Sequence, residues 1–272
     1  MRTNFFRNIE NYIAEQASLN IYCQAVNLRN ALRGKLHRVT AGEDGLLHSA
    51  YDGQTRIHLC RRGRHNRYKR GVMAGVDALA REYHLDKIPT FNGGTFIDCG
   101  ANVGELGYWA RERAMTYIAF EPEGPEARCC DLNNYEGQEM THRKALWKED
   151  TVLEFHSKPD TADSSVFEID NSAACVRINA VALDNIVDTA TLSGTVILKV
   201  EAEGAEPEVL EGAKKTLPFI DYVTVDCGYE RGIEKKHTFV ETCEILHDAG
   251  FKLAKAQFRR ITALYRNTQK NR

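Results

Sequence analysis

The chain has 272 residues, of which 43% are hydrophobic and 27% are charged, and its formal net charge is −2 at pH 7. This composition excludes a fibrous or largely disordered chain, and the length suits one large α/β domain with an N-terminal extension. Because the charges nearly balance, the chain as a whole gives no reason to expect nucleic-acid binding, and we expect none.

The N-terminus and the cysteines indicate the compartment. No stretch has the apolar core of a signal peptide or the length of a membrane span. The 8 cysteines include no Cys-x-x-Cys pair, and several lie inside apolar runs, so we expect reduced and buried thiols. Both features predict a cytoplasmic protein without a transmembrane segment.

Residues 1–90 are predicted to form a mainly helical extension that also contains a hairpin. Apolar residues recur at helical spacing over 4–36 and over 72–83. Between these segments, Asp52-Gly53 predicts a tight turn that joins strands at 45–51 and 55–60. Covering the active site and mediating oligomer formation both remain open as roles for this extension.

A basic segment over 56–70 contains seven Lys or Arg residues. Within it, Arg64 and Arg67 are candidate substrate-binding residues, because guanidinium groups bind phosphate and carboxylate groups well. Two interpretations stay open: the segment binds an anionic acceptor such as a lipid-linked glycan, or it is a solvated surface. Its single aromatic residue, Tyr68, disfavours stacking on RNA bases.

From about residue 91 the pattern changes to short apolar strands that alternate with helical segments. This alternation predicts a doubly wound, mostly parallel sheet with helices on both faces, in a domain over 91–272. Strands are expected at 95–99, 116–120, 139–146, 151–156, 175–182, 195–201, 220–227 and 261–266. Helices are expected at 104–113, 124–136, 206–215 and 236–249.

A glycine-containing loop follows the first strand of this domain. The strand ends at Asp98, and Gly100, Asn102 and Gly104 lead into a helix. Glycines let a ligand approach the backbone closely, and the start of a helix offers unpaired N–H groups. In open α/β sheets ligands bind beyond the carboxyl ends of the strands, where this loop lies.

Glu121 ends the next strand, close to the spacing of about 20 residues that separates a glycine-rich loop from a ribose-binding acid. Its carboxylate can accept hydrogen bonds from both ribose hydroxyls. Because the loop does not read Gly-x-Gly-x-x-Gly, adenosine without a pyrophosphate fits better than a dinucleotide. The competing interpretation is that the glycines only form a turn and Glu121 is a solvated acid.

Three blocks of sequence resemble the FkbM family of S-adenosylmethionine-dependent methyltransferases. They are Phe-Ile-Asp-Cys-Gly-Ala-Asn-Val-Gly at 96–104, Ala-Phe-Glu-Pro-Glu at 119–123 and Leu-Lys-Val-Glu-Ala-Glu-Gly-Ala-Glu at 198–206. The resemblance implies a class I methyltransferase fold, a seven-stranded sheet with its last strand antiparallel, and S-adenosylmethionine as cofactor. It also implies methyl transfer to a hydroxyl of a carbohydrate, glycolipid or natural product.

Further cofactor-binding candidates are Pro122, Ala145 and Glu201. The family usually has Asp where this chain has Glu201, so the carboxylate stands one methylene further out; either the backbone adjusts to this, or the role of the position differs. The competing interpretation of the acids at 201–206 is that they stabilise the start of a helix.

A hydroxyl is a poor nucleophile, so a base or a metal must help it to attack. Glu201, Glu203 and Asp226 are the catalytic candidates, as a base or as ligands of a divalent cation. No His-x-x-His or comparable cluster accompanies them, so no metal residue is assigned. Candidate substrate-binding residues near these acids are Lys199, Tyr229 and His237.

Two other functions compete with an O-methyltransferase of a small-molecule or glycan acceptor. An RNA or nucleotide methyltransferase that uses the basic segment predicts a motif such as Asn-Pro-Pro-Tyr after the fourth strand, where this chain has Glu-Ala-Glu-Gly. A non-catalytic module that keeps the fold predicts a lost glycine loop, but that loop is intact. The acceptor, the oligomeric state, metal dependence and the choice of general base are left open.

Overall fold

The computed structural model describes residues 17–42, 48–89, 93–157, 165–167 and 174–270. The N-terminal region consists of a helix, a three-stranded antiparallel sheet, a 3₁₀ helix, a second helix and a short 3₁₀ turn. These are α2 (Leu19–Leu32), β1 (Arg38–Ala41), β2 (His48–Tyr51), β3 (Arg56–Leu59), η1 (Arg62–Tyr68), α3 (Val72–Glu82) and η2 (Leu85–Lys87).

The predicted hairpin and the predicted helix over 72–83 are confirmed. The helix expected over 4–36 is confirmed in its C-terminal half, and residues 1–16 lie outside the described residues. β1 was not predicted, because its four residues are too few to display an alternation of apolar and polar positions.

A central sheet of mostly parallel strands confirms the predicted fold class. Its order is β11-β12-β10-β9-β4-β5, and β12 runs antiparallel to the other five strands. The strands are β4 (Gly94–Cys99), β5 (Met115–Phe120), β9 (Thr195–Val200), β10 (Tyr222–Asp226), β11 (Phe251–Gln257) and β12 (Thr262–Asn267). β11 was missed in the sequence because it is an edge strand with four consecutive exposed residues and little apolar alternation.

In the described residues the central sheet has six strands rather than the seven that were expected. The strand predicted over 139–146 is reduced to one bridge between Phe120 and His142 and to β6 (Ala145–Leu146). The carboxylate of Asp131 accepts the N–H groups of Met140 and Thr141, so these amides do not enter a strand ladder. β6 instead joins β8 (Ala174–Val181) and β7 (Thr151–Ser157) in a separate sheet.

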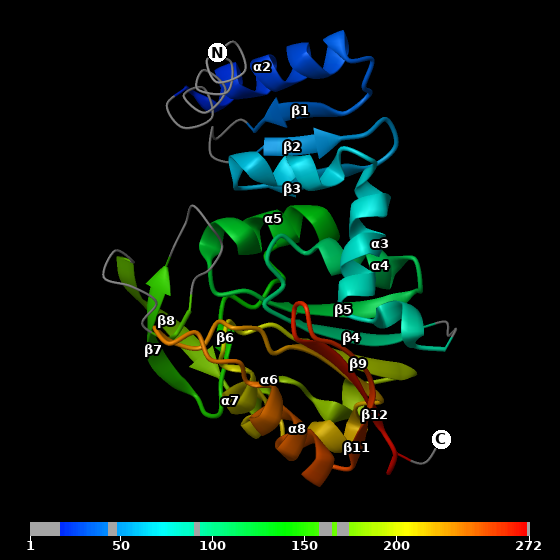
Figure 1. The fold of residues 1–272 in the computed structure, drawn as a ribbon, viewed down its shortest axis with the longest axis vertical. Helices are drawn as coiled ribbons and strands as arrows, with labels where there is room; N and C mark the ends of the chain where they lie inside the picture. Colours follow the sequence, from blue (N-terminus) through cyan, green and yellow to red (C-terminus); the bar gives the residue numbers. More distant parts are fainter. Residues whose placement is uncertain (1–16, 43–47, 90–92, 158–164, 168–173, 271–272) are drawn as a thin grey trace.

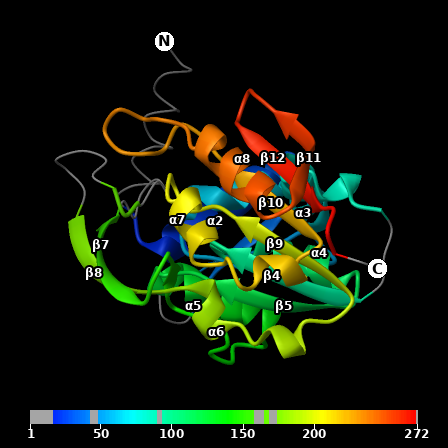
Figure 2. The ribbon, with the colours of Figure 1, turned by 90° about the horizontal axis from the view of Figure 1, so that it is seen from below.

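Helices cover both faces of the central sheet (Figures 1 and 2). They are α4 (Glu105–Arg111), α5 (Gly124–Asn134), α6 (Leu183–Ile186), α7 (Glu206–Glu211) and α8 (Phe239–Asp248), with 3₁₀ turns η3 (Thr189–Thr191) and η4 (Leu217–Phe219). Because side chains alternate along a strand, Phe96 packs in the core with α3 and α4, and Ile97 packs in the core with α7 and α8. No helix in the described part of the chain is long and apolar enough to cross a membrane.

The N-terminal region shares its core with the central sheet. Ile57 of β3 and Val76 of α3 belong to the same buried cluster as Phe96. The backbone of His58 also exchanges two hydrogen bonds with the side chain of Asn133 in α5, at 2.8 and 3.1 Å. These contacts hold β3 and α3 against the central sheet and α5 (Figure 1).

The buried rings of His37, His48 and His65 lie together in the interior of the N-terminal region. His65 Nδ1 lies 3.2 Å from His37 Nε2, and its Nε2 lies 2.9 Å from the hydroxyl of Tyr22. Burial, followed by the charge of Arg62, lowers the pKa of His48 to about 4. Burial, followed by the neighbouring His37 and His48, lowers the pKa of His65 to about 3. These rings are therefore neutral in the folded protein near neutral pH.

We expect buried His48 and His65 to lower the free energy of unfolding as the pH falls from about 6.5 to about 4. Unfolded histidines bind a proton near pH 6.5, whereas buried His48 and His65 resist protonation, so acid favours the unfolded chain. In His48→Leu the slope of unfolding free energy against pH, measured by urea denaturation near pH 5, should decrease by up to about 1.4 kcal/mol per pH unit. His247→Gln, a change at a side chain that is 83% exposed, is the control. Equal slopes in His48→Leu and the native protein would contradict this expectation.

Candidate functional site

A cavity of about 310 Å³ lies at the carboxyl ends of β4, β5 and β9, within the range of about 300–1,000 Å³ that is typical of ligand sites. Many of the residues selected from the sequence line it: Arg64, Arg67, Asp98, Gly100, Asn102, Glu121, Pro122, Ala145, Lys199, Glu201 and Glu203. The lining does not include Gly104, Asp226, Tyr229 and His237. The cavity therefore brings together all the cofactor candidates except Gly104, and it leaves the catalytic candidate Asp226 and the substrate candidates Tyr229 and His237 outside.

The glycine loop forms one wall of this cavity. Gly100 has a φ of +71°, and a Cβ there would lie 2.2 Å from the carbonyl oxygen of Glu201. Asn102 also has a positive φ, 50°, and its Oδ1 accepts the N–H of Val103 at 2.9 Å. Gly104 has a φ of +77° and packs on Asn134, so it sets the start of α4 rather than the wall itself. Only small residues at 100 and 104 permit this bend.

Glu121 follows β5 and faces the cavity from beside the loop. The side chain is almost completely buried, and its carboxylate accepts the N–H groups of Asn102 at 2.8 Å and Glu123 at 2.9 Å. Burial raises the pKa of Glu121 to about 8, although these two N–H groups partly offset the effect. A carboxylate has about four lone-pair sites, so Glu121 keeps acceptor capacity for a ligand in the cavity.

Asp98 and Lys199 form a buried ion pair that joins the ends of β4 and β9. The ammonium of Lys199 lies 3.0 Å from Asp98 Oδ1 and 3.0 Å from Glu201 Oε2, and it donates to the carbonyl of Gly100 at 2.6 Å. The hydroxyl of Tyr117 donates to Asp98 Oδ2 at 2.7 Å. Because an ammonium has three donors, Lys199 has none left for a substrate, and its contacts fit a structural role.

Arg260, in the turn between β11 and β12, was not selected from the sequence. Its guanidinium donates to Asp226 and, at 2.8 Å, to Glu201. Burial alone would raise the pKa of Glu201, but Lys199 and Arg260 outweigh burial and lower it to about 2. A carboxylate with such a low pKa is a weak general base. No sequence pattern around residue 260 indicates this role, because its partners are distant in the chain.

Asp226 is fully buried behind the cavity lining. Burial, opposed by Arg260, raises the pKa of its carboxyl group. Together with Glu201 it binds the Arg260 guanidinium at the place where the sequence allowed a divalent cation. Among the described residues, no group of three or more His, Cys, Asp or Glu side chains is arranged to hold a metal ion.

Glu230, in the loop after β10, is an acid that lines the cavity and was not selected from the sequence. Its Oε2 atom is buried and has no hydrogen-bond partner in the described part of the chain. Burial, followed by the charges of Asp226 and Glu201, raises its pKa above the ordinary range of a carboxyl. The sequence did offer one indication of this residue: Glu230 closely follows a strand that ends in an acid, Asp226.

Tyr229 and His237 lie outside the cavity. Tyr229 is 58% exposed, and its ring centre is 5.7 Å from that of His237. Glu203 lines the cavity in a left-handed conformation with a φ of 48°, so β9 does not continue to this residue. Lys199 and Glu201 therefore meet on one side of the strand, and Glu203 is placed by the following turn.

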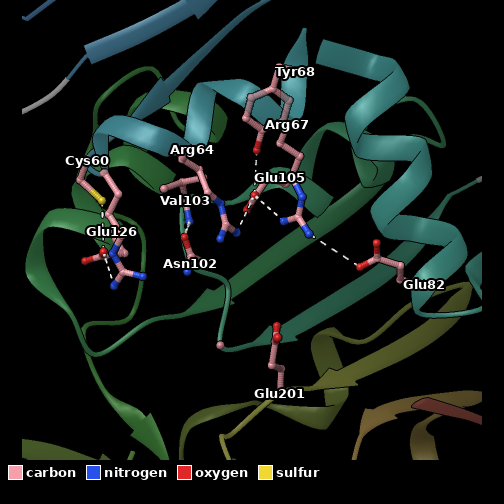
Figure 3. A network of polar contacts seen from close by, with 12 residues as sticks. Cys60, Arg64, Arg67, Tyr68, Glu82, Asn102, Val103, Glu105, Glu126 and Glu201 are labelled. Carbon is pink, nitrogen blue, oxygen red and sulfur yellow. Dashed lines mark hydrogen bonds and ion pairs between the residues drawn. The ribbon is translucent and has the colours of Figure 1, made fainter. Parts of the chain in front are cut away.

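Arg64 and Arg67 reach the cavity from η1 and meet Glu105 at the start of α4 (Figure 3). Arg64 lies 3.1 Å from Glu105 Oε1, Arg67 lies 3.7 Å from it, and the hydroxyl of Tyr68 donates to it at 2.8 Å. Burial alone would raise the pKa of Glu105, but the two arginines outweigh it and lower that pKa. The basic segment thus contributes to the cavity wall.

Comparison with solved structures returns methyltransferases of low sequence identity. Magnesium protoporphyrin IX methyltransferase from Synechocystis PCC 6803, with bound S-adenosylmethionine, is 11% identical, covers 96% of both chains and has a TM-score of 0.41. The 1,6-didemethyltoxoflavin-N1-methyltransferase from Burkholderia thailandensis is 14% identical over 72% of this chain and 78% of that chain, with a TM-score of 0.37. A putative RNA methyltransferase from Pyrococcus horikoshii is 13% identical over 71% and 81%, with a TM-score of 0.36.

A family model provides the identification. No curated protein matches the chain. The model described as the methyltransferase FkbM domain matches residues 98–253. This region is more than half of the chain and contains the glycine loop, Glu121, Glu201 and Glu230. The protein therefore belongs to the FkbM family of methyltransferases.

Proposed function

We propose that this protein binds S-adenosylmethionine in the cavity and methylates a hydroxyl group of a carbohydrate, glycolipid or other small-molecule acceptor. The observation that carries the proposal is the buried carboxylate of Glu121, which faces the cavity beside the glycine loop and keeps acceptor capacity. A buried carboxylate in this position is stabilised by the two hydroxyl donors of a ribose.

The remaining lining fits the other parts of the cofactor. Pro122 and Ala145 lie at the Glu121 end and would flank the adenosine. The bend at Gly100 lets a ligand approach the backbone closely.

When bound, S-adenosylmethionine supplies a methyl group on a sulfonium sulfur; an acceptor oxygen takes this methyl, and the sulfur keeps the electron pair of the broken bond. The chain must position the hydroxyl and take up its proton. Positioning contributes about 7–11 kcal/mol in well-oriented systems, and a general base contributes a factor of about 10²–10⁴. Cavity shape should therefore dominate the rate.

Glu230 fits the role of general base better than the acids selected from the sequence. Glu201 has a lowered pKa and Asp226 is buried with Arg260, whereas Glu230 lines the cavity with an unpaired oxygen. Its raised pKa suits proton uptake near neutral pH. In this proposal the proton of the acceptor hydroxyl moves to a carboxylate oxygen of Glu230.

Glu230→Gln is expected to lower kcat by about 10²–10⁴-fold and to leave the affinity for S-adenosylhomocysteine within about threefold of the native value. Gln keeps the shape of the side chain but accepts no proton. The matched control is Glu234→Gln, a change at an exposed acid in the same loop. The measurement is the initial rate of methyl transfer between pH 6 and 9. A native rate in Glu230→Gln would assign the base to another residue.

The function itself is tested by incubating the protein with S-adenosylmethionine that carries a carbon-13 methyl group and with fractionated sugars, glycolipids and small-molecule alcohols. The proposal expects the label in a base-stable methyl ether, recognised by its carbon-13 chemical shift. Label found as a base-labile ester, on nitrogen, or in an added RNA fraction would contradict hydroxyl methylation. Calorimetry with S-adenosylhomocysteine tests cofactor binding separately from the acceptor.

A further inference from the structure

η1 belongs to the predicted N-terminal extension, yet its side chains form part of the cavity wall. Arg64 and Arg67 point from this 3₁₀ helix toward the start of α4, and Glu201 lies on the opposite side (Figure 3). Glu105, which is almost completely buried, fixes Arg64 through an ion pair at 3.1 Å. The guanidinium is therefore held in place before any ligand binds.

Arg64 keeps hydrogen-bond donors that its protein contacts do not use. Its ion pair with Glu105 engages one terminal nitrogen, and its Nε is buried and has no hydrogen-bond partner among the described residues. A guanidinium has five N–H donors in a planar fork, which suits a second carboxylate. The side chain is 27% exposed, so a ligand in the cavity can reach it.

The other cations of the lining are differently placed. Lys199 is fully engaged with acids and carbonyls, and Arg260 holds Asp226 and Glu201. Arg67 lies 3.7 Å from Glu105 and 3.7 Å from Glu82, with one terminal nitrogen on each. The last cation, Lys144, adjoins Ala145 at the adenosine end of the cavity.

The proposed cofactor has a matching distribution of charge. Its adenosine is assigned to the part of the cavity that holds Glu121 and Ala145, which leaves the space between Arg64 and Glu201 for its amino-acid group. That group carries one carboxylate and one ammonium, and the cavity there offers a cation on one wall and an acid on the other. The charges are therefore complementary.

We propose that Arg64 binds the carboxylate of the methionyl group of S-adenosylmethionine, so that the N-terminal region completes the cofactor site. This inference rests on the proposed function. It assigns to η1 a contact with the cofactor, and it leaves the acceptor to the loops after β9 and β10.

The experiment compares two ligands by calorimetry: S-adenosylhomocysteine and its decarboxylated analogue, which keeps the amino group. In the native protein the carboxylate should improve affinity by about 10- to 100-fold, the range for hydrogen bonds to charged groups. In Arg64→Gln, S-adenosylhomocysteine should bind about 10- to 100-fold more weakly, whereas the analogue should change by less than about threefold. Arg64→Lys, which keeps the charge, should recover part of the loss. Arg70→Gln, at an exposed site outside the lining, is the matched control.

Two outcomes overturn the inference. In one, the native protein binds both ligands equally; in the other, Arg64→Gln weakens both by the same factor, which means that Arg64 only supports the glycine loop through Glu105. If Arg64→Gln does not fold, the ligand comparison in the native protein and in Arg64→Lys decides the question. Failure of the proposed function is distinct, because the native protein would then bind neither ligand.

Discussion

Glu121→Ala is expected to weaken the binding of S-adenosylhomocysteine by at least about 100-fold, because two hydrogen bonds to a charged group are lost and each contributes about 1.5–3 kcal/mol. The fold should persist. Burial raises the pKa of Glu121 to about 8, and its two hydrogen-bond partners in the protein are backbone N–H groups at the cavity edge. Its removal therefore affects the ligand more than the protein.

Calorimetry on the native protein and on Glu121→Ala measures this effect, with Glu139→Ala, at a side chain that is 74% exposed, as the control. The native affinity should also rise as the pH approaches about 8, because only the ionised carboxylate accepts both hydroxyls. Glu121→Gln should show no such pH dependence. Equal affinities of Glu121→Ala and the native protein would place the ribose elsewhere.

Lys199→Met is expected to have the largest effect on stability, lowering the free energy of unfolding by about 3–5 kcal/mol. Lys199 is 3% exposed and its partner Asp98 is 1% exposed, so the change leaves a buried carboxylate without its cation. Tyr117 still donates to Asp98, but one hydroxyl does not replace an ammonium. The melting temperature should fall by roughly 10 °C.

Urea denaturation tests this expectation, and Lys214→Met, at an exposed lysine, is the matched control. The double variant Lys199→Met with Asp98→Asn should be more stable than Lys199→Met alone, because it removes the unpaired charge. A Lys199→Met variant as stable as the native protein would show that the ion pair does not hold β4 and β9 together.

The cofactor side of the cavity was predictable because its signals are local. Asp98 lies near the end of an apolar strand, the glycine loop follows that strand, and Glu121 follows the next one; parallel strands end at the same edge of a sheet. The side chains that complete the site are not local. Arg260 reaches Asp226 and Glu201 from a turn that lies far along the chain, and no spacing rule relates these positions.

Competition for hydrogen bonds explains the error in the sheet. The segment 139–146 contains enough apolar residues to suggest a strand, but Asp131 accepts two of its amides and diverts it. The basic segment was ambiguous for a related reason. A run of arginines indicates a positive charge but not the groups that pair with it. The partner that holds Arg64 at the cavity is the buried Glu105, which lies far from it in the sequence. The extents of the two predicted domains, 1–90 and 91–272, remain predictions.

A crystal structure of the protein with S-adenosylhomocysteine tests the central claim most directly. We expect the two ribose hydroxyls to donate to the carboxylate of Glu121, with the adenine toward Ala145 and the amino-acid group on the side of Arg64. Electron density for the ligand outside this cavity, or with its adenosine at the Glu201 end, would contradict the account.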